Sequence, residues 1–88
     1  MQDIRTVTLS VPDIKNAECE RRVRAAFRGT EGILADSAKF NTGSVTVTYD
    51  SMKLRIKNIE FVIANVGFSA DDIPANPAAR AALPPECR

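Results

Sequence analysis

The chain has 88 residues, of which 44% are hydrophobic and 26% are charged, with a formal net charge of +1 and no histidine. A chain of this length forms one small domain, and a charge so near zero excludes a bulk electrostatic attraction to nucleic acid or to an anionic membrane. The absence of histidine excludes the usual general base and the commonest neutral metal ligand.

The first half of the chain predicts a strand, a helix and a second strand. Residues 6–11 alternate between apolar and hydroxyl-bearing side chains, which is typical of a half-buried strand, and Pro12 ends it. A helical stripe of apolar residues follows over residues 17–28, with Asn16 as a good N-cap. Residues 33–40 have the pattern of a weaker strand.

The second half supplies two more strands and a second helix. Residues 45–49 show the clearest strand pattern after the first, residues 55–66 carry a helical stripe, and residues 68–73 predict a short last strand. The resulting order is β-α-β-β-α-β. This order predicts a ferredoxin-like α/β sandwich, in which two helices cover one face of a four-stranded antiparallel sheet.

We expect residues 1–73 to form the domain and residues 74–88 to form a C-terminal tail. The tail begins with a cluster of chain breakers, and Asn76 is placed to cap a short helix from Pro77. No apolar run reaches the roughly 20 residues that a membrane helix needs, and the N-terminus has no secretory pattern. We therefore expect a cytoplasmic protein without membrane insertion.

Two cysteines, Cys19 and Cys87, are too few for a disulfide scaffold, and in a reducing compartment we expect free thiols or metal ligands. Cys19 lies near the start of the first predicted helix, where unpaired backbone N–H groups favour a thiolate, and Arg21 and Arg22 are near enough to add to this. Thiolate is the form that binds Cu(I), Zn(II) or Hg(II). A cysteine on an apolar helix stripe is also common as a small core residue, so both readings stay open.

The segments TVTLSVP, ECERRVRAAF, TGSVTVTYD and IEFVIANVGFSAD, in this order and spacing, resemble the heavy-metal-associated domain family. This family includes copper chaperones, repeats of P-type ATPases and a bacterial mercury-binding protein. The resemblance covers about residues 4–73 and implies a ferredoxin-like fold. It also implies transport or detoxification of a soft metal ion, namely copper, zinc or mercury, without enzymatic catalysis. The partners implied are metal-transporting P-type ATPases or other metal-handling proteins.

The chain departs from the motif of this family, G-M-x-C-x-x-C, in which two thiolates hold one ion between the first strand and the first helix. Asp13 takes the place of the glycine, Ile14 of the methionine and Asn16 of the first cysteine, so that an N-x-x-C stretch with Cys19 alone remains. An amide oxygen is a hard donor that does not match a soft ion. We therefore interpret Asn16 as a helix cap that shapes the loop.

Cys87 is the candidate second ligand beside Cys19. In the implied fold the last strand runs away from the metal loop, and the residues from Pro74 to Cys87 can cover on the order of 25–30 Å, enough to return to it. The two sulfurs would then form a metal site, or a disulfide under oxidation. A frayed tail with an unpaired thiol is the alternative.

Two other functions remain open on the sequence. A domain that no longer binds metal can serve as a protein-interaction module through its arginine-rich first helix. Cys19 and Cys87 can instead act as a redox-responsive thiol pair. A homodimer in which two copies of Cys19 share one ion is also compatible with the sequence.

Overall fold

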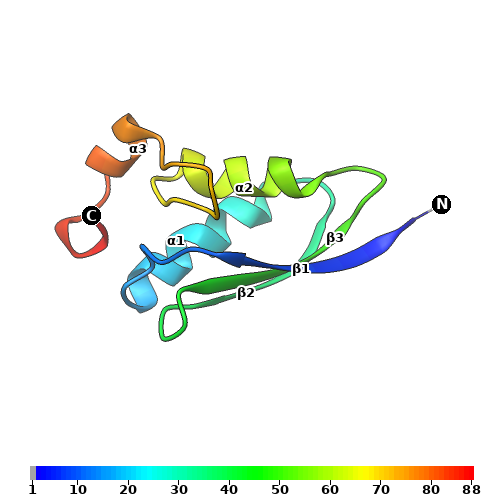
Figure 1. Cartoon of the computed structure of the whole chain (residues 1–88), viewed down its shortest axis with the longest axis horizontal. Helices are drawn as coiled ribbons and strands as arrows, with labels where there is room; N and C mark the ends of the chain where they lie inside the picture. The colour runs from blue at the N-terminus through cyan, green and yellow to red at the C-terminus, as the bar shows by residue number, and fades with distance from the viewer. Residues whose placement is uncertain (1) are drawn as a thin grey trace.

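The structure is a computed structural model and describes residues 2–88. Three antiparallel strands form one sheet in the order β1-β3-β2, with β1 at Ile4–Ser10, β2 at Ile33–Lys39 and β3 at Ser44–Asp50. Figure 1 shows two longer helices on one face of this sheet, α1 (Ala17–Arg28) and α2 (Ile56–Asn65). The tail adds α3 (Pro77–Ala81) and the 3-10 turn η1 (Pro85–Cys87).

The sheet has one buried face because its strands alternate apolar and hydroxyl-bearing residues, as predicted. Leu9 of β1 pairs with Val45 of β3, and both are buried, as is Val47. On the opposite, exposed face the hydroxyls of Thr8 and Thr46 lie 3.0 Å apart. This alternation directs the apolar side chains toward the helices.

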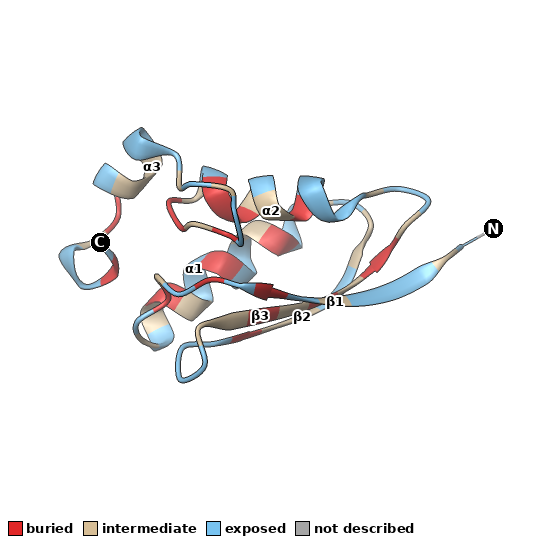
Figure 2. Cartoon of the chain, viewed as in Figure 1, coloured by how far each residue is buried: buried red, intermediate tan, exposed pale blue. Residues whose placement is uncertain are grey.

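The core lies between the sheet and the two longer helices, and Figure 2 shows buried residues on both of these layers. The buried side chains of the two helices include Cys19, Val23 and Phe27 on α1 and Ile59 and Ile63 on α2. Phe61, which we interpreted as a core or near-core aromatic residue, is 47% exposed instead. It is separated from Ile59 and Ile63 by about 200° around the helix, so it lies on the other side.

The prediction of a fourth strand at residues 68–73 is wrong, because in the described chain this segment pairs with no strand and the sheet has three. The Ala70 N–H donates to the Ile73 oxygen at 2.9 Å, and the Ile73 N–H donates back at 2.8 Å, which closes a tight turn. Asp71 in this turn has a φ of +50°, a left-handed conformation outside the β region of a regular strand. The turn meets β1 at Ser10, whose backbone oxygen accepts the Asp71 N–H at 2.8 Å.

The tail forms the predicted short helix and packs against the domain. Asn76 caps α3 with its side chain, and its N–H donates to the Ala64 oxygen of α2 at 2.9 Å. Gly67 lies directly beneath the tail: a Cβ there would be 2.8 Å from Leu83 Cδ1 and 3.0 Å from Arg80 Cα. Leu83 is buried. The tail therefore has a defined place over the end of α2.

Candidate metal and thiol site

The loop between β1 and α1 is anchored in the core at two points. The Val11 N–H donates to the Gly43 oxygen at 2.7 Å, and the Ile14 N–H donates to the Val11 oxygen at 3.2 Å. Both Val11 and Ile14 are buried, so the apolar anchor that the family motif places beside the metal loop is retained by Ile14. This anchoring fixes the entry into α1.

Asn16 is the N-cap of α1, as the sequence predicted. Its Oδ1 accepts the Cys19 N–H at 3.1 Å, so the cap bonds the same residue that carries the sulfur. Cys19 is fully buried on the stripe of α1. The two arginines that we expected to favour its thiolate, Arg21 and Arg22, both form ion pairs with Glu18.

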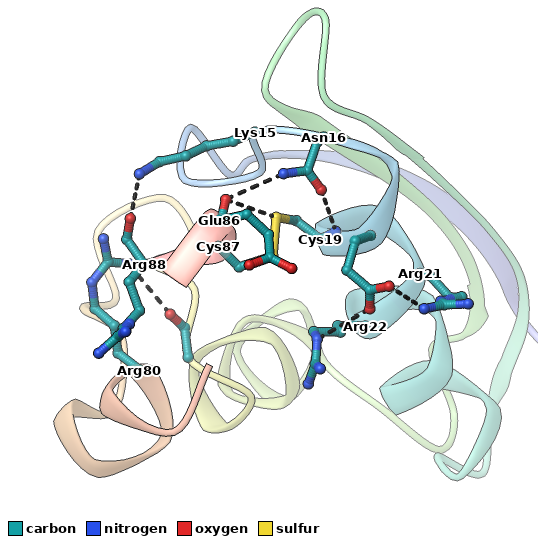
Figure 3. Close-up of a disulfide and its surroundings, with 11 residues drawn as sticks. Lys15, Asn16, Cys19, Arg21, Arg22, Arg80, Glu86, Cys87 and Arg88 are labelled. Atoms are coloured by element: carbon teal, nitrogen blue, oxygen red, sulfur yellow. Dashed lines mark hydrogen bonds and ion pairs between the residues drawn. A yellow bond between two sulfur atoms is a disulfide. The ribbon is translucent and has the colours of Figure 1, made fainter. Parts of the chain in front are cut away.

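Cys87 returns to this loop and forms a disulfide with Cys19, across 68 positions of the chain and with a Cα–Cα distance of 5.7 Å. Figure 3 shows the bond, with η1 lying beside the start of α1. Cys87 is as fully buried as Cys19. The frayed tail is therefore not what the structure shows. The expectation of two free thiols also differs from the structure, because docking of the tail brings both sulfurs within bonding range.

Polar contacts on the rim of the disulfide hold η1 against the loop (Figure 3). The Asn16 Nδ2 donates to the Glu86 oxygen at 3.2 Å, and the Lys15 ammonium donates to the backbone oxygen of Arg88. The Cys19 Sγ lies 3.8 Å from the same Glu86 oxygen. The loop thus contacts the residues on both sides of Cys87.

Asp13 forms a second connection between loop and tail, which the sequence did not predict. Its Oδ2 accepts the Ser69 N–H at 3.0 Å, the Ser69 hydroxyl at 2.8 Å and Arg80 Nη1 at 3.2 Å. Burial alone raises the pKa of Asp13, but the hydrogen bonds from Ser69 and the charges of Arg80 and Lys15 outweigh it and hold this pKa below its usual value. The one sequence feature that could have indicated this connection is the carboxylate of Asp13, at a position where the family motif has glycine.

The site offers sulfur and little else as a metal ligand. Among residues 2–88, no three or more histidine, cysteine, aspartate or glutamate side chains are grouped so that they can hold an ion. Two sulfurs suit a soft ion of low coordination number, and they do not complete the four-ligand shell that Zn(II) takes in proteins. In the part of the chain described, no helix has the length and apolar character to cross a membrane.

The fold and the cysteine-bearing loop define an α/β domain of the ferredoxin-like class with its site at the start of α1. The model of the heavy-metal-associated domain family matches residues 8–69, and the chain belongs to this family. The mercuric transport protein periplasmic component of Pseudomonas aeruginosa is 31% identical over 64 residues, 73% of this chain and 70% of that protein. Its counterpart from Salmonella typhi is 30% identical over the same shares.

Solved structures agree with this assignment. The crystal structure of oxidised MerP from Ralstonia metallidurans CH34 has a TM-score of 0.74 at 29% identity, covering 78% of this chain and 96% of that one. The CopZ metallochaperone has a TM-score of 0.72 at 21% identity, covering 75% and 98%, and so shares the fold. In both comparisons the matched share leaves about a fifth to a quarter of this chain outside the common fold.

Proposed function

We propose that this protein binds a soft metal ion through the thiolates of Cys19 and Cys87 and passes it on during metal transport or detoxification. One observation carries the proposal. The only two cysteines of the sequence, 68 positions apart, meet at the loop that precedes α1. Relatives named for mercuric transport support Hg(II) as the ion, and two-sulfur coordination suits Cu(I) as well. Transfer is ligand exchange between thiolates, so no enzymatic catalysis is involved.

Binding requires the reduced form, because a disulfide has no thiolate. Reduction takes two electrons and two protons from a dithiol protein or from two small thiol molecules, which are oxidised to a disulfide in exchange. Each thiol then loses its proton when it binds the ion. A disulfide holds its sulfurs about 2 Å apart, whereas two thiolates on one ion, with bonds of about 2.3 Å, lie up to about 4.6 Å apart. The two sulfurs must therefore move apart by about 2–3 Å to admit the ion.

Exchange of the ion between thiolates indicates the kind of partner, and the disulfide indicates the kind of compartment. A partner that accepts the ion must present its own thiolates, as a metal-transporting P-type ATPase or another metal-handling protein of the same family would. The cytoplasmic location stays a prediction. The disulfide and the relatives named as periplasmic components support an oxidising compartment instead.

A second candidate function is favoured by the disulfide itself. In it, Cys19 and Cys87 form a redox-responsive pair whose bond opens and closes with the thiol potential, and no metal is bound. Thiol-state measurements alone do not separate the two functions, since both include the same disulfide. Metal affinity does separate them.

The experiment is an anaerobic titration of the reduced protein with Cu(I) or Hg(II) against a competing chelator, beside Cys19→Ser and Cys87→Ser. One ion per chain, bound by the wild-type protein and lost in both variants, is the expected result. Half an ion per chain, unchanged by Cys87→Ser, would show a homodimer bridged by Cys19 and would overturn the role of Cys87. A reduced wild-type protein that fails to compete for either ion would overturn metal binding and leave the redox pair and the protein-interaction module as the functions.

A further inference from the structure

We infer that Asp13 is a positioning residue, whose contacts with Arg80 and Ser69 hold the tail where Cys87 meets Cys19. The inference deepens the proposed function and rests on it for the role of the pair in metal binding. The pairing of the two sulfurs is measurable without any metal. Asp13 touches neither sulfur, so its effect passes through the tail.

The tail depends on such contacts because it has little structure of its own. The helix α3 has five residues, too few for a helix to be stable alone in water. Arg80 is the charged residue of α3, and its guanidinium donates both to Asp13 and to the Gly67 oxygen at 3.4 Å. Arg80 therefore adds a contact with the β1–α1 loop to those of Asn76 and Leu83, which place α3 over the end of α2.

The Asp13 carboxylate is itself held in one orientation. The N–H and the hydroxyl of Ser69 both donate to Oδ2, the oxygen that also receives Arg80. The side chains of Asp13 and Arg80 are 26% and 35% exposed, so this ion pair is partly shielded from water. A charge-assisted pair in such surroundings is stronger than one fully exposed on the surface.

Asp13 lies in the same short loop as Lys15 and Asn16, which hold η1, and this loop leads into the helix that carries Cys19. Both sulfurs are thus positioned relative to one segment of the chain. Glycine, which the family motif has in place of Asp13, has no side chain with which to hold a tail. The loop that lacks the first cysteine of the motif carries the groups that hold the segment with Cys87.

The test measures the effective concentration of Cys87 toward Cys19, from the ratio of disulfide to dithiol in glutathione buffers, by alkylation and mass spectrometry. We expect Asp13→Asn to lower it about tenfold, the lower end of what a hydrogen bond to a charged group contributes. Arg80→Gln should lower it by a similar factor. The double variant should fall little below either single variant, since all three lose the same ion pair.

Asp36→Asn is the matched control, because it removes the ion pair of Asp36 with Arg24, at 2.8 Å, between α1 and β2 and away from the tail. It should leave the effective concentration within about twofold of wild type. Urea unfolding of each reduced variant shows that the domain is folded, and Arg80→Gln keeps the test valid if Asp13→Asn disturbs the loop.

Two results would overturn the inference. One is an effective concentration in Arg80→Gln that stays at the wild-type level. The other is a double variant whose loss is the full product of the two single losses, as for residues that act independently. Neither result involves metal. Failure of the proposed function would appear separately, as a wild-type protein that binds no ion while its disulfide still responds to Asp13→Asn and Arg80→Gln.

Discussion

The side-chain nitrogen of Asn16 donates to the backbone oxygen of Glu86 at 3.2 Å, while the oxygen of the same amide caps α1 at Cys19. One small side chain therefore bonds the helix that carries the first sulfur and the turn that carries the second. The residue that replaces a family cysteine has no sulfur. It instead helps to hold the turn that carries Cys87 beside Cys19.

Moving the second sulfur back into the loop tests this relationship. We expect Cys87→Ser alone to lose tight Cu(I) binding, and Asn16→Cys combined with Cys87→Ser to regain one ion per chain. Positions 16 and 19 are three residues apart at the start of α1 and lie on one side of it. Anaerobic competition with a chelator gives the affinities. A double variant that binds no better than Cys87→Ser would mean that the loop itself, and not the missing sulfur, prevents binding.

Reduction of the disulfide should lower the free energy of unfolding substantially. A cross-link over 68 positions restricts the unfolded chain, and the loop-entropy relation gives a loss of about 4 kcal/mol on reduction. Urea unfolding of the oxidised and reduced protein measures the difference. Cys87→Ser serves as the control and should match the reduced protein, whereas equal stability of the oxidised and reduced forms would contradict the prediction.

Gly67→Ala should displace the tail. The residue has a φ of +105°, which a side chain strains, and its new Cβ would lie 2.8 Å from Leu83 Cδ1. We expect a loss of about 1–3 kcal/mol in the free energy of unfolding and a lower effective concentration of Cys87. Gly29→Ala is the control, because the nearest atom to a Cβ there is 3.9 Å away. Similar losses in the two variants would show that the tail does not pack closely over Gly67.

The stability of the reduced protein should fall in acid through Asp13. Its pKa is lowered in the folded state, because hydrogen bonds from Ser69 and the charges of Arg80 and Lys15 outweigh burial. The stabilisation is thus fully present above the unfolded value of about 3.9 and is lost as the pH falls through the folded value. Denaturant unfolding from pH 7 to pH 2 should show wild type and Asp13→Asn converging at the acid end. A constant gap between the two curves would contradict this.

Much of the fold was predictable because it depends on local signals. The strand alternation, the helical stripes and the caps at Asn16 and Asn76 act within a few residues, and the structure confirms them. The fourth strand was not predictable from its alternation. Asp71 adopts a left-handed conformation in a turn that meets β1 at Ser10, a contact between residues 61 positions apart.

The site was predictable only in its residue types. The length of the tail set an upper limit on its reach and allowed Cys87 to meet Cys19, but it equally allowed a frayed end. Where the tail lies depends on contacts such as that of Asp13 with Arg80. These contacts join residues 67 positions apart, and no periodic pattern in the sequence indicates them. A carboxylate in a loop is, by itself, more often a turn residue.

The bond between Cys19 and Cys87 also determines how the molecule responds to being stretched by its two ends. The disulfide encloses the chain from Cys19 to Cys87 in a covalent ring and leaves β1 and the following loop outside it. Under tension only these first residues of the oxidised chain can extend, to about 60 Å when fully stretched. The reduced chain can extend along its whole length, to about 300 Å. The reduced protein can therefore be unfolded completely by force, whereas the oxidised protein can be extended only by detaching β1 and the loop that follows it.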